Sequence, residues 1–259
     1  MATHLLKDKG LATIVFDYPA TLNVMGLNEI REFSKVTQDI VDDSSIKVVL
    51  IRANGPIFGA GGDLGSFQPD CCDPPEVLRE IGKELNPTIL RLRGMPAIVV
   101  AAVHGAVAGG SMGPMNAADM VIAAKGTRFN TAYARVGASP DAGSTWFLPR
   151  IVGMRKTMEL MLLAENFDAD TALRYGLVNQ VVPPEQLRDV TDKLVARLLH
   201  GPHETYIRMK RLIYQSCSTS LAQQLDDEIE HFATVSTTKD FEEGISAFMN
   251  KRAPHFGCQ

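Results

Sequence analysis

The sequence predicts an α/β fold with a buried parallel sheet, followed by a helical C-terminal region. Apolar runs of strand length alternate with segments whose apolar residues recur at helical spacing. From residue 184 onward the pattern is helical throughout and contains no further run typical of a strand. We therefore expect a layered α/β core over residues 1–198 and a helical region over residues 199–259.

The expected strands are apolar and rich in β-branched residues, and they span residues 11–17, 47–53, 97–103, 120–124 and 177–182. The expected helices before residue 184 span residues 27–41, 75–92, 110–118 and 154–164, with another that restarts at Asp168. In the second helix the inward stripe is Leu78, Ile81, Leu85, Ile89 and Leu92. Pro87 lies inside that stripe and lacks a backbone N–H, so we expect a kink or a break there.

The C-terminal region has an apolar face of its own, formed by Leu221, Leu225, Ile229 and Phe232. A face of that size needs a covering surface, which is either the α/β core or a second chain. The sequence therefore predicts self-association.

Composition excludes several classes of function. The net charge of -4 argues against a nucleic-acid-binding surface. The four cysteines, Cys71, Cys72, Cys217 and Cys258, have neither a disulfide framework nor the spacing of a metal site. The cysteine pattern therefore predicts a protein of the reducing cytoplasm with no metal. No apolar stretch reaches membrane-spanning length, so we expect no membrane partner.

Two glycine-rich turns are the most informative motifs. One covers residues 58–64 (FGAGGDL) and the other residues 104–113 (HGAVAGGSMG), and each follows an expected buried strand. Glycine lets the backbone approach a ligand closely because it has no Cβ. Two such turns, each offering one N–H, could form an oxyanion hole.

The second turn also matches the nucleophile-elbow pattern G-x-S-x-G at residues 109–113, with Ser111 as the nucleophile. Asp141 and a later histidine (His200, His203 or His231) would complete a hydrolase triad in the required order. A five-residue pattern occurs often by chance, and this hypothesis leaves the turn at residues 58–64 unexplained. We favour a glycine-rich turn and keep the serine hydrolase as an alternative.

Asp141 is the candidate base. It lies between Pro140 and Ala142-Gly143, among mostly small or apolar residues, which predicts partial desolvation and a better proton acceptor. An aspartate after a loop is also a favoured N-cap, here of a helix starting near Ala142. Both roles remain open.

Together these stretches resemble the crotonase, or enoyl-CoA hydratase/isomerase, superfamily. The resemblance runs from Leu11 to Phe256 and includes further landmarks at residues 149–153, 175–178 and 248–252. It implies a spiral of ββα turns, a C-terminal trimerisation region, trimers or hexamers, and an acyl-CoA thioester substrate with no separate cofactor.

The resemblance also assigns roles to residues. The N–H groups of Ala60 and Gly110 would hold the thioester oxygen, and Asp141 would transfer the proton. The residues expected to contact substrate are Met25, Gly62, Asp63, Leu64, Tyr133, Trp146, Phe248 and Lys251. Phe248 and Lys251 would approach the CoA of the same or a neighbouring subunit.

Departures from the family pattern indicate the reaction. The two hydratase glutamates align with Gly113 and Tyr133, neither of which is a carboxylate. Residues 139–146 (SPDAGSTW) look most like the ring-modified phenylacetyl-CoA isomerase branch, in which the aspartate is the base. Ser111 stands where the family usually has glycine. We therefore expect an acyl-CoA isomerase.

Other hypotheses remain open. Residues 151–162 resemble the aromatic acyl-CoA dehalogenases, although that branch has tryptophan at the position of Tyr133 and histidine near Glu84. An enoyl-CoA hydratase and a non-catalytic acyl-CoA-binding protein are further alternatives. Glu84 is either a second acid or, as we favour, a solvated helix glutamate.

Overall fold

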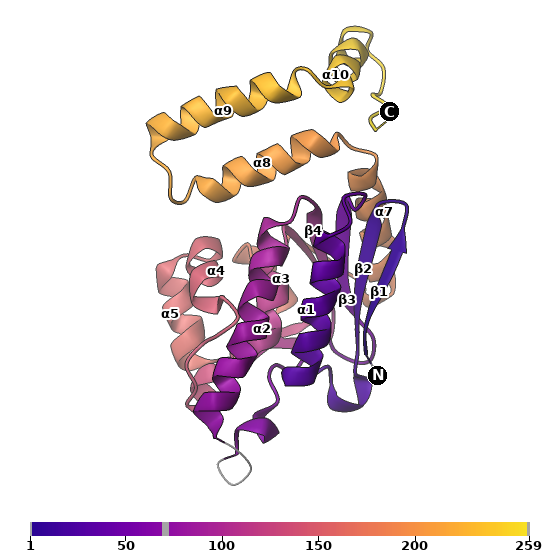
Figure 1. Ribbon diagram of the computed structural model, residues 1–259. Coiled ribbons are helices and arrows are strands. Elements are labelled where there is room, and N and C mark those ends of the chain that lie inside the picture. The colour runs from indigo at the N-terminus through magenta and orange to yellow at the C-terminus, as the bar shows by residue number, and fades with distance from the viewer. Residues whose placement is uncertain (1, 69–72, 258–259) are drawn as a thin grey trace.

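A computed structural model describes residues 2–68 and 73–257 and contains two sheets (Figure 1). The strands of the larger sheet are, in spatial order, β1 (Ala2–Asp8), β2 (Leu11–Asp17), β3 (Val48–Ala53), β4 (Ile98–Val103), β6 (Met120–Ala124) and β9 (Gln180–Val182). β1 pairs with β2 in antiparallel register, and every other pair in this sheet is parallel. The smaller sheet has the order β5 (Ala106–Ala108), β7 (Arg128–Asn130) and β8 (Phe167–Asp168). The predicted α/β class is confirmed.

The helices that follow or cover these strands are α1 (Leu27–Val41), α2 (Pro74–Gly94), α3 (Met112–Ala117), α4 (Ser144–Ile151), α5 (Met154–Leu163), α6 (Ala169–Arg174) and α7 (Leu187–Leu199). The C-terminal helices are α8 (His203–Gln215), α9 (Leu221–Val235) and α10 (Lys239–Met249). Short 3₁₀ turns precede the site elements: η2 (Leu64–Phe67), η3 (Gly109–Ser111) and η4 (Tyr133–Val136).

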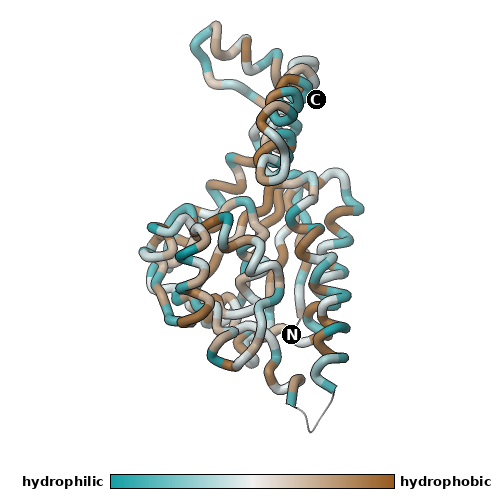
Figure 2. Tube along the Cα trace, turned by 90° about the vertical axis from the view of Figure 1, so that its left-hand side faces the viewer, coloured by the Kyte–Doolittle hydropathy of each residue, from teal (hydrophilic) through white to brown (hydrophobic). Residues whose placement is uncertain are grey.

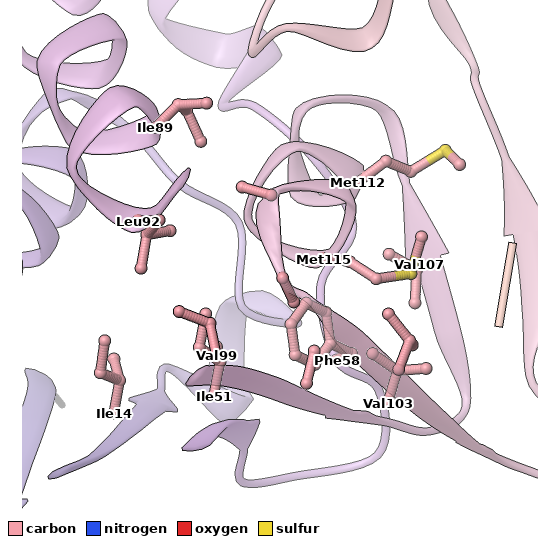
Figure 3. Packing of buried hydrophobic residues seen from close by; sticks show 14 of the residues in the cluster. Ile14, Ile51, Phe58, Ile89, Leu92, Val99, Val103, Val107, Met112 and Met115 are labelled. Atoms are coloured by element: carbon pink, nitrogen blue, oxygen red, sulfur yellow. The ribbon is translucent and has the colours of Figure 1, made fainter. Parts of the chain in front are cut away.

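Both faces of the larger sheet are covered, which explains why its strands are apolar along their whole length. Val49 and Ile51 of β3 belong to the main core with α1, α2 and α3. Figure 3 shows Leu92 and Met115 approaching this face from the helices. Val48 and Leu50 face the other way and pack with Val195 of α7. Two cores on opposite faces hold the ends of β3 and β4, from which the glycine-rich turns start.

The structure differs from the sequence analysis of these elements at three points. The N-terminal strand β1 was not predicted, because it is an edge strand with largely exposed side chains. Lys9 and Gly10, both at positive φ, form the two-residue hairpin that returns it to β2. Helix α2 continues through Pro87 without a break, and Leu78 on its expected inward stripe is exposed.

The C-terminal helices bury little of their own surface. Lys210, Val235 and Ala247 are the buried residues of α8, α9 and α10. The predicted apolar face of α9 is open to solvent, with Leu221 74% and Ile229 67% exposed. Figures 1 and 2 show these helices projecting from the core.

Candidate active site

The two glycine-rich turns lie side by side, as predicted. Gly59 and Val107 form a parallel bridge, in which Gly59 N donates to Ala106 O (3.1 Å) and Ala108 N donates to Gly59 O (3.0 Å). A Cβ on Gly61, whose φ is +105°, would lie 3.2 Å from Ala108 O. Glycine at position 61 therefore allows both the turn and its close contact with the second loop.

The prediction that the Ala60 N–H is an oxyanion donor is wrong. Its backbone N–H donates to Leu22 O at 3.1 Å, so it is already paired and unavailable to a ligand. Gly62, two residues later, is exposed, and its N–H has no acceptor within the described parts of the chain. The sequence alone marked Gly62 only as a substrate contact.

Gly110 lies directly opposite Gly62. A Cβ on residue 110 would lie 4.0 Å from the backbone nitrogen of Gly62 and 3.6 Å from Oδ1 of Asp141. Gly110 also precedes α3, where the first N–H groups of a helix lack intrahelical acceptors. The N–H groups of Gly62 and Gly110 are therefore the candidate oxyanion pair.

Backbone hydrogen bonds fix the direction of the Gly62 N–H. Met25 N donates to Gly61 O at 2.9 Å. Since the peptide bond is planar and trans, the Gly62 N–H points away from that carbonyl and from Met25. The segment around Met25 is held by Asn23, which is buried and donates to Asn54 O (2.8 Å) and Ile57 O (2.9 Å). Asn23 is a positioning residue that sequence reasoning missed, and its signal was a lone asparagine in an apolar segment.

The Asp141 carboxylate also lies near Gly110. The Tyr133 hydroxyl donates to Asp141 Oδ1 at 2.7 Å and lies 3.3 Å from Ser144 Oγ. The expectation of a partly buried carboxylate was wrong, because Asp141 is exposed. The helix-cap hypothesis was also wrong: Gly143 is the N-cap of α4, without any side-chain capping bond. Asp141 contributes only its backbone C=O, which accepts from Ser144 N at 2.9 Å.

Tyr133 is buried and protonated. Desolvation raises its pKa above the ordinary value, and the neighbouring Asp141 charge raises it further. The phenol therefore stays a hydrogen-bond donor to the carboxylate at neutral pH.

Position 113 has no space for an acid. A Cβ on Gly113 would lie 2.5 Å from Ala142 Cβ and 2.9 Å from Ala142 O. Ala142 itself is buried in a left-handed conformation with φ of 49°. The two positions that hold glutamates in family hydratases are therefore different here. Ala142 fills the space beside Gly113, and Tyr133 occupies the other position.

Ser111 is not placed as a nucleophile. It is 3% exposed, and its Oγ accepts from Gly61 N at 3.0 Å. None of the candidate histidines forms a hydrogen bond with it in the described structure; His200, for example, is bonded to Ala196 O. The serine hydrolase alternative is therefore wrong.

The remaining expected contacts divide into two groups. Asp63 and Leu64 adjoin Gly62, where the Asp63 carboxylate accepts from Gly65 N (3.0 Å) and Leu64 is exposed. Phe248, in the last turn of α10, and Lys251, just after that helix, are by contrast exposed. Figure 1 shows α10 projecting from the core together with α9. The structure does not bring Phe248 and Lys251 together with the glycine turns of the same chain.

Trp146 lies beside Arg150, whose guanidinium carbon is 4.1 Å from the centroid of the Trp146 ring. With Arg93 and Tyr214 it lines a cavity of about 180 Å³ whose lining residues include neither Asp141 nor Gly110. Its role as a substrate contact stays a prediction.

Glu84 lies on the surface of α2, 3.9 Å from Arg31 Nε and substantially exposed. This supports the interpretation of Glu84 as a solvated helix glutamate.

No group of three or more metal-ligating side chains occurs within residues 2–68 and 73–257. No helix in those same ranges has the length and apolar character needed to cross a membrane. Cys71, Cys72 and Cys258 lie outside the described residues, while Cys217 is a free, exposed thiol.

Comparison with known proteins identifies the family of this chain. Residues 7–259 match the enoyl-CoA hydratase/isomerase family. The chain is 34% identical over 250 residues to the trans-2-decenoyl-[acyl-carrier-protein] isomerase of Streptococcus mutans, covering 96% of this chain and 95% of that one. It is 32% identical over 250 residues to the 1,2-epoxyphenylacetyl-CoA isomerase of Escherichia coli, covering 96% of this chain and 95% of that one.

Hydratases are similar as well. The crotonyl-CoA hydratase of Syntrophomonas wolfei is 30% identical over 254 residues, covering 97% of this chain and 96% of that one. The crystal structure of an enoyl-CoA hydratase from Polaromonas sp. JS666 superposes with a TM-score of 0.91 at 29% identity, covering 98% and 99% of the two chains. With the family matched over nearly its whole length, the chain belongs to the enoyl-CoA hydratase/isomerase family of the crotonase superfamily and is an enzyme of that family.

Proposed function

We propose that this enzyme is an acyl-thioester isomerase that moves a double bond, or a ring-derived unsaturation, through a thioester enolate. The observation that supports this most directly is a convergence of three groups. Gly62 N and Asp141 Oδ1 both lie within about 4 Å of the point where a side chain on Gly110 would begin. Two amide donors and one carboxylate are the groups that proton abstraction next to a thioester requires.

The thioester oxygen would accept hydrogen bonds from the N–H groups of Gly62 and Gly110. Asp141 would take a proton from carbon, and the electrons of that C–H bond would become the enolate C=C bond while negative charge moves to the oxygen. The amides stabilise that charge because they are already oriented. The protonated Asp141 exchanges its proton with solvent and then delivers a proton to a different carbon, which restores the carbonyl and leaves the double bond shifted.

Tyr133 supports the base. Its hydroxyl occupies Asp141 Oδ1 and leaves Oδ2 for the substrate proton. The exposed side of Asp141 is where substrate would lie. Met25, Asp63 and Leu64 flank Gly62 and would border the thioester.

Hydration is disfavoured by the same geometry. Water addition needs acids that activate the water and deliver its proton, and position 113 cannot take any side chain without displacing Ala142. The reaction we propose uses only backbone amides and one carboxylate, so it requires no cofactor beyond the CoA or other carrier of the substrate.

Mass spectrometry of products made in deuterated water tests the reaction class. The panel contains aliphatic and aromatic 2-enoyl and 3-enoyl thioesters, each on CoA and on acyl carrier protein, because the relatives use both carriers. We expect isomers whose only mass change is deuterium incorporation. A product heavier by one water would show a hydratase, loss of halide from a halogenated aromatic ester a dehalogenase, and binding without turnover a non-catalytic protein.

We also propose that the chain forms a trimer or a pair of trimers. The exposed apolar residues of α9, including Leu225 and Phe232, support association through the C-terminal helices. Phe248 and Lys251 would then reach the CoA of a neighbouring subunit. Light scattering during size-exclusion chromatography should give three or six times the 28.2 kDa chain mass, and a monomer at micromolar concentration would contradict this.

A further inference from the structure

Ser111 is a buried polar residue beneath the proposed oxyanion hole that the reaction scheme does not use. Its Oγ accepts a hydrogen bond from Gly61 N at 3.0 Å, across 50 positions of sequence. This bond joins the two glycine-rich turns at a point one residue before Gly62.

The hydroxyl occupies space that another side chain would need. A Cβ on Gly59 would lie 2.4 Å from Ser111 Oγ and 2.8 Å from Ser111 Cβ, closer than atoms approach without displacement. Gly59 does not have positive φ, so its backbone conformation does not by itself require glycine. The atoms of Ser111 are the closest that a Cβ at position 59 would meet, and Asn23 O follows at 3.4 Å, so serine at position 111 is the main reason that position 59 is glycine.

Gly61 is held at both of its polar groups. Ser111 binds its N–H, and Met25 N donates to its carbonyl at 2.9 Å. Glycine has the freest backbone rotation of all residues, so these two anchors restrict the rotations that would turn the next peptide. That next peptide carries the Gly62 N–H.

We infer that Ser111 is a positioning residue for the oxyanion donor Gly62, and that Gly59 and Ser111 form one coupled pair in which a hydroxyl on either residue fills the shared space. This inference rests on the proposed function, because it assigns Ser111 a role in holding the thioester oxygen. It gives a physical reason for serine at position 111.

Infrared difference spectroscopy tests the role directly, with hexanoyl-CoA labelled with carbon-13 at the thioester carbonyl as the probe. In the wild-type enzyme the oxyanion donors should shift the carbonyl stretch to lower frequency. In Ser111→Ala we expect a smaller shift and about a tenfold lower kcat with nearly unchanged KM, since an oriented donor acts mainly on the transition state. Thr127→Val is the matched control, because it removes another fully buried hydroxyl that bonds to Ala124 O away from the site. It should change thermal stability without changing the carbonyl shift.

A double-mutant cycle tests the coupling. Gly59→Ser alone should lower both the melting temperature and kcat, because its Cβ collides with Ser111. Adding Ser111→Gly should recover most of both losses, so that the double variant is better than Gly59→Ser. Wild-type kcat and carbonyl shift in Ser111→Ala, or a double variant as impaired as the sum of the single changes, would overturn the inference.

Failure of the proposed function gives a different result. If the thioester does not use this oxyanion hole, the wild-type enzyme itself will show no carbonyl shift with the probe. If only the inference is wrong, the wild-type shift will be present and Ser111→Ala will retain it.

Discussion

Two tyrosine–aspartate pairs in this chain look alike and differ in how their charge is compensated. Tyr133 donates to Asp141, and Tyr214 donates to Asp119. Asp119 is nearly buried and also faces Lys210 Nζ at 2.9 Å and Val99 N at 2.7 Å. Asp141 is exposed and forms no ion pair within the described parts of the chain.

The difference separates a structural carboxylate from a reactive one. The Asp119 charge is balanced by Lys210, whose other hydrogen bond to Ala97 O ties α8 to the start of β4. Asp141 Oδ2 has no ion-pair partner among the described residues, and the carboxylate lies beside the candidate amide donors Gly62 and Gly110. Only Asp141 can therefore take a proton from a ligand without breaking the fold.

The largest expected effect is on turnover in Asp141→Asn. The substitution keeps the shape and the contact with Tyr133 but removes the base, so kcat should fall by about 10³-fold or more. Affinity for a saturated acyl-CoA, measured by calorimetry, should stay within a few-fold of wild type. Isomerisation of a 3-enoyl-CoA at the wild-type rate would contradict the assignment.

Asp119→Asn should instead affect stability. It leaves the Lys210 ammonium buried without its counter-ion, and breaking such a pair costs about 3–5 kcal/mol of unfolding free energy. Urea denaturation measures this loss, and kcat per folded enzyme should remain near wild type. The more exposed pair Lys7–Asp43 provides the control, because Asp43→Asn should cost much less unfolding free energy than Asp119→Asn. Equal losses of unfolding free energy in Asp119→Asn and Asp43→Asn would show that Asp119 is not a special structural carboxylate.

Substitution of Tyr133 should likewise affect catalysis and substitution of Tyr214 stability, with smaller effects than those of the aspartate variants. Tyr133→Phe removes the hydrogen bond that orients Asp141, so we expect about a tenfold lower kcat with little change in KM. Tyr214→Phe leaves catalysis unchanged and lowers stability by about 1–2 kcal/mol, because a hydrogen bond to a buried charge is lost. Steady-state kinetics and denaturation of both variants measure these effects. A catalytic defect in Tyr214→Phe would contradict the structural role of the Tyr214–Asp119 pair.

The smallest effect concerns alkaline pH. Burial and a neighbouring carboxylate raise the pKa of both tyrosines above the ordinary value of about 10. Above that pH an unfolded tyrosine loses its proton while the folded one keeps it, so stability is present below pH 10 and declines as pH rises. Each tyrosine should contribute up to about 1.4 kcal/mol per pH unit to the decline. Denaturation between pH 9 and 11 should show a shallower decline in either phenylalanine variant, and identical slopes in all three proteins would exclude the effect.

Much of the fold could be predicted because apolar pattern and burial coincide. The strand at residues 11–17 and the helix at residues 27–41 have the predicted bounds. The three strands of the smaller sheet were not predicted, because segments of two or three residues are too short to show a period. Their positions depend on pairing with distant segments.

The site was predictable in its parts and not in its geometry. Glycine content located both turns, and Asp141 was the acid that remained. Which peptide N–H faces the ligand depends on the left-handed conformation of Gly61, and sequence does not fix that rotation. The donor was therefore misplaced from Gly62 to Ala60. The contact of Trp146 with Arg150 was not predicted for a related reason, because it depends on the packing of α4.

The most direct test of the central claim is deuterium exchange at the α-carbon of a saturated acyl-CoA, followed by mass spectrometry. It requires only the amide pair and the base, so it does not depend on knowing the natural acyl group. We predict that the wild-type enzyme incorporates solvent deuterium and that Asp141→Asn binds the same ester without doing so. Exchange at an undiminished rate in Asp141→Asn would show that another group moves the proton and would contradict the account.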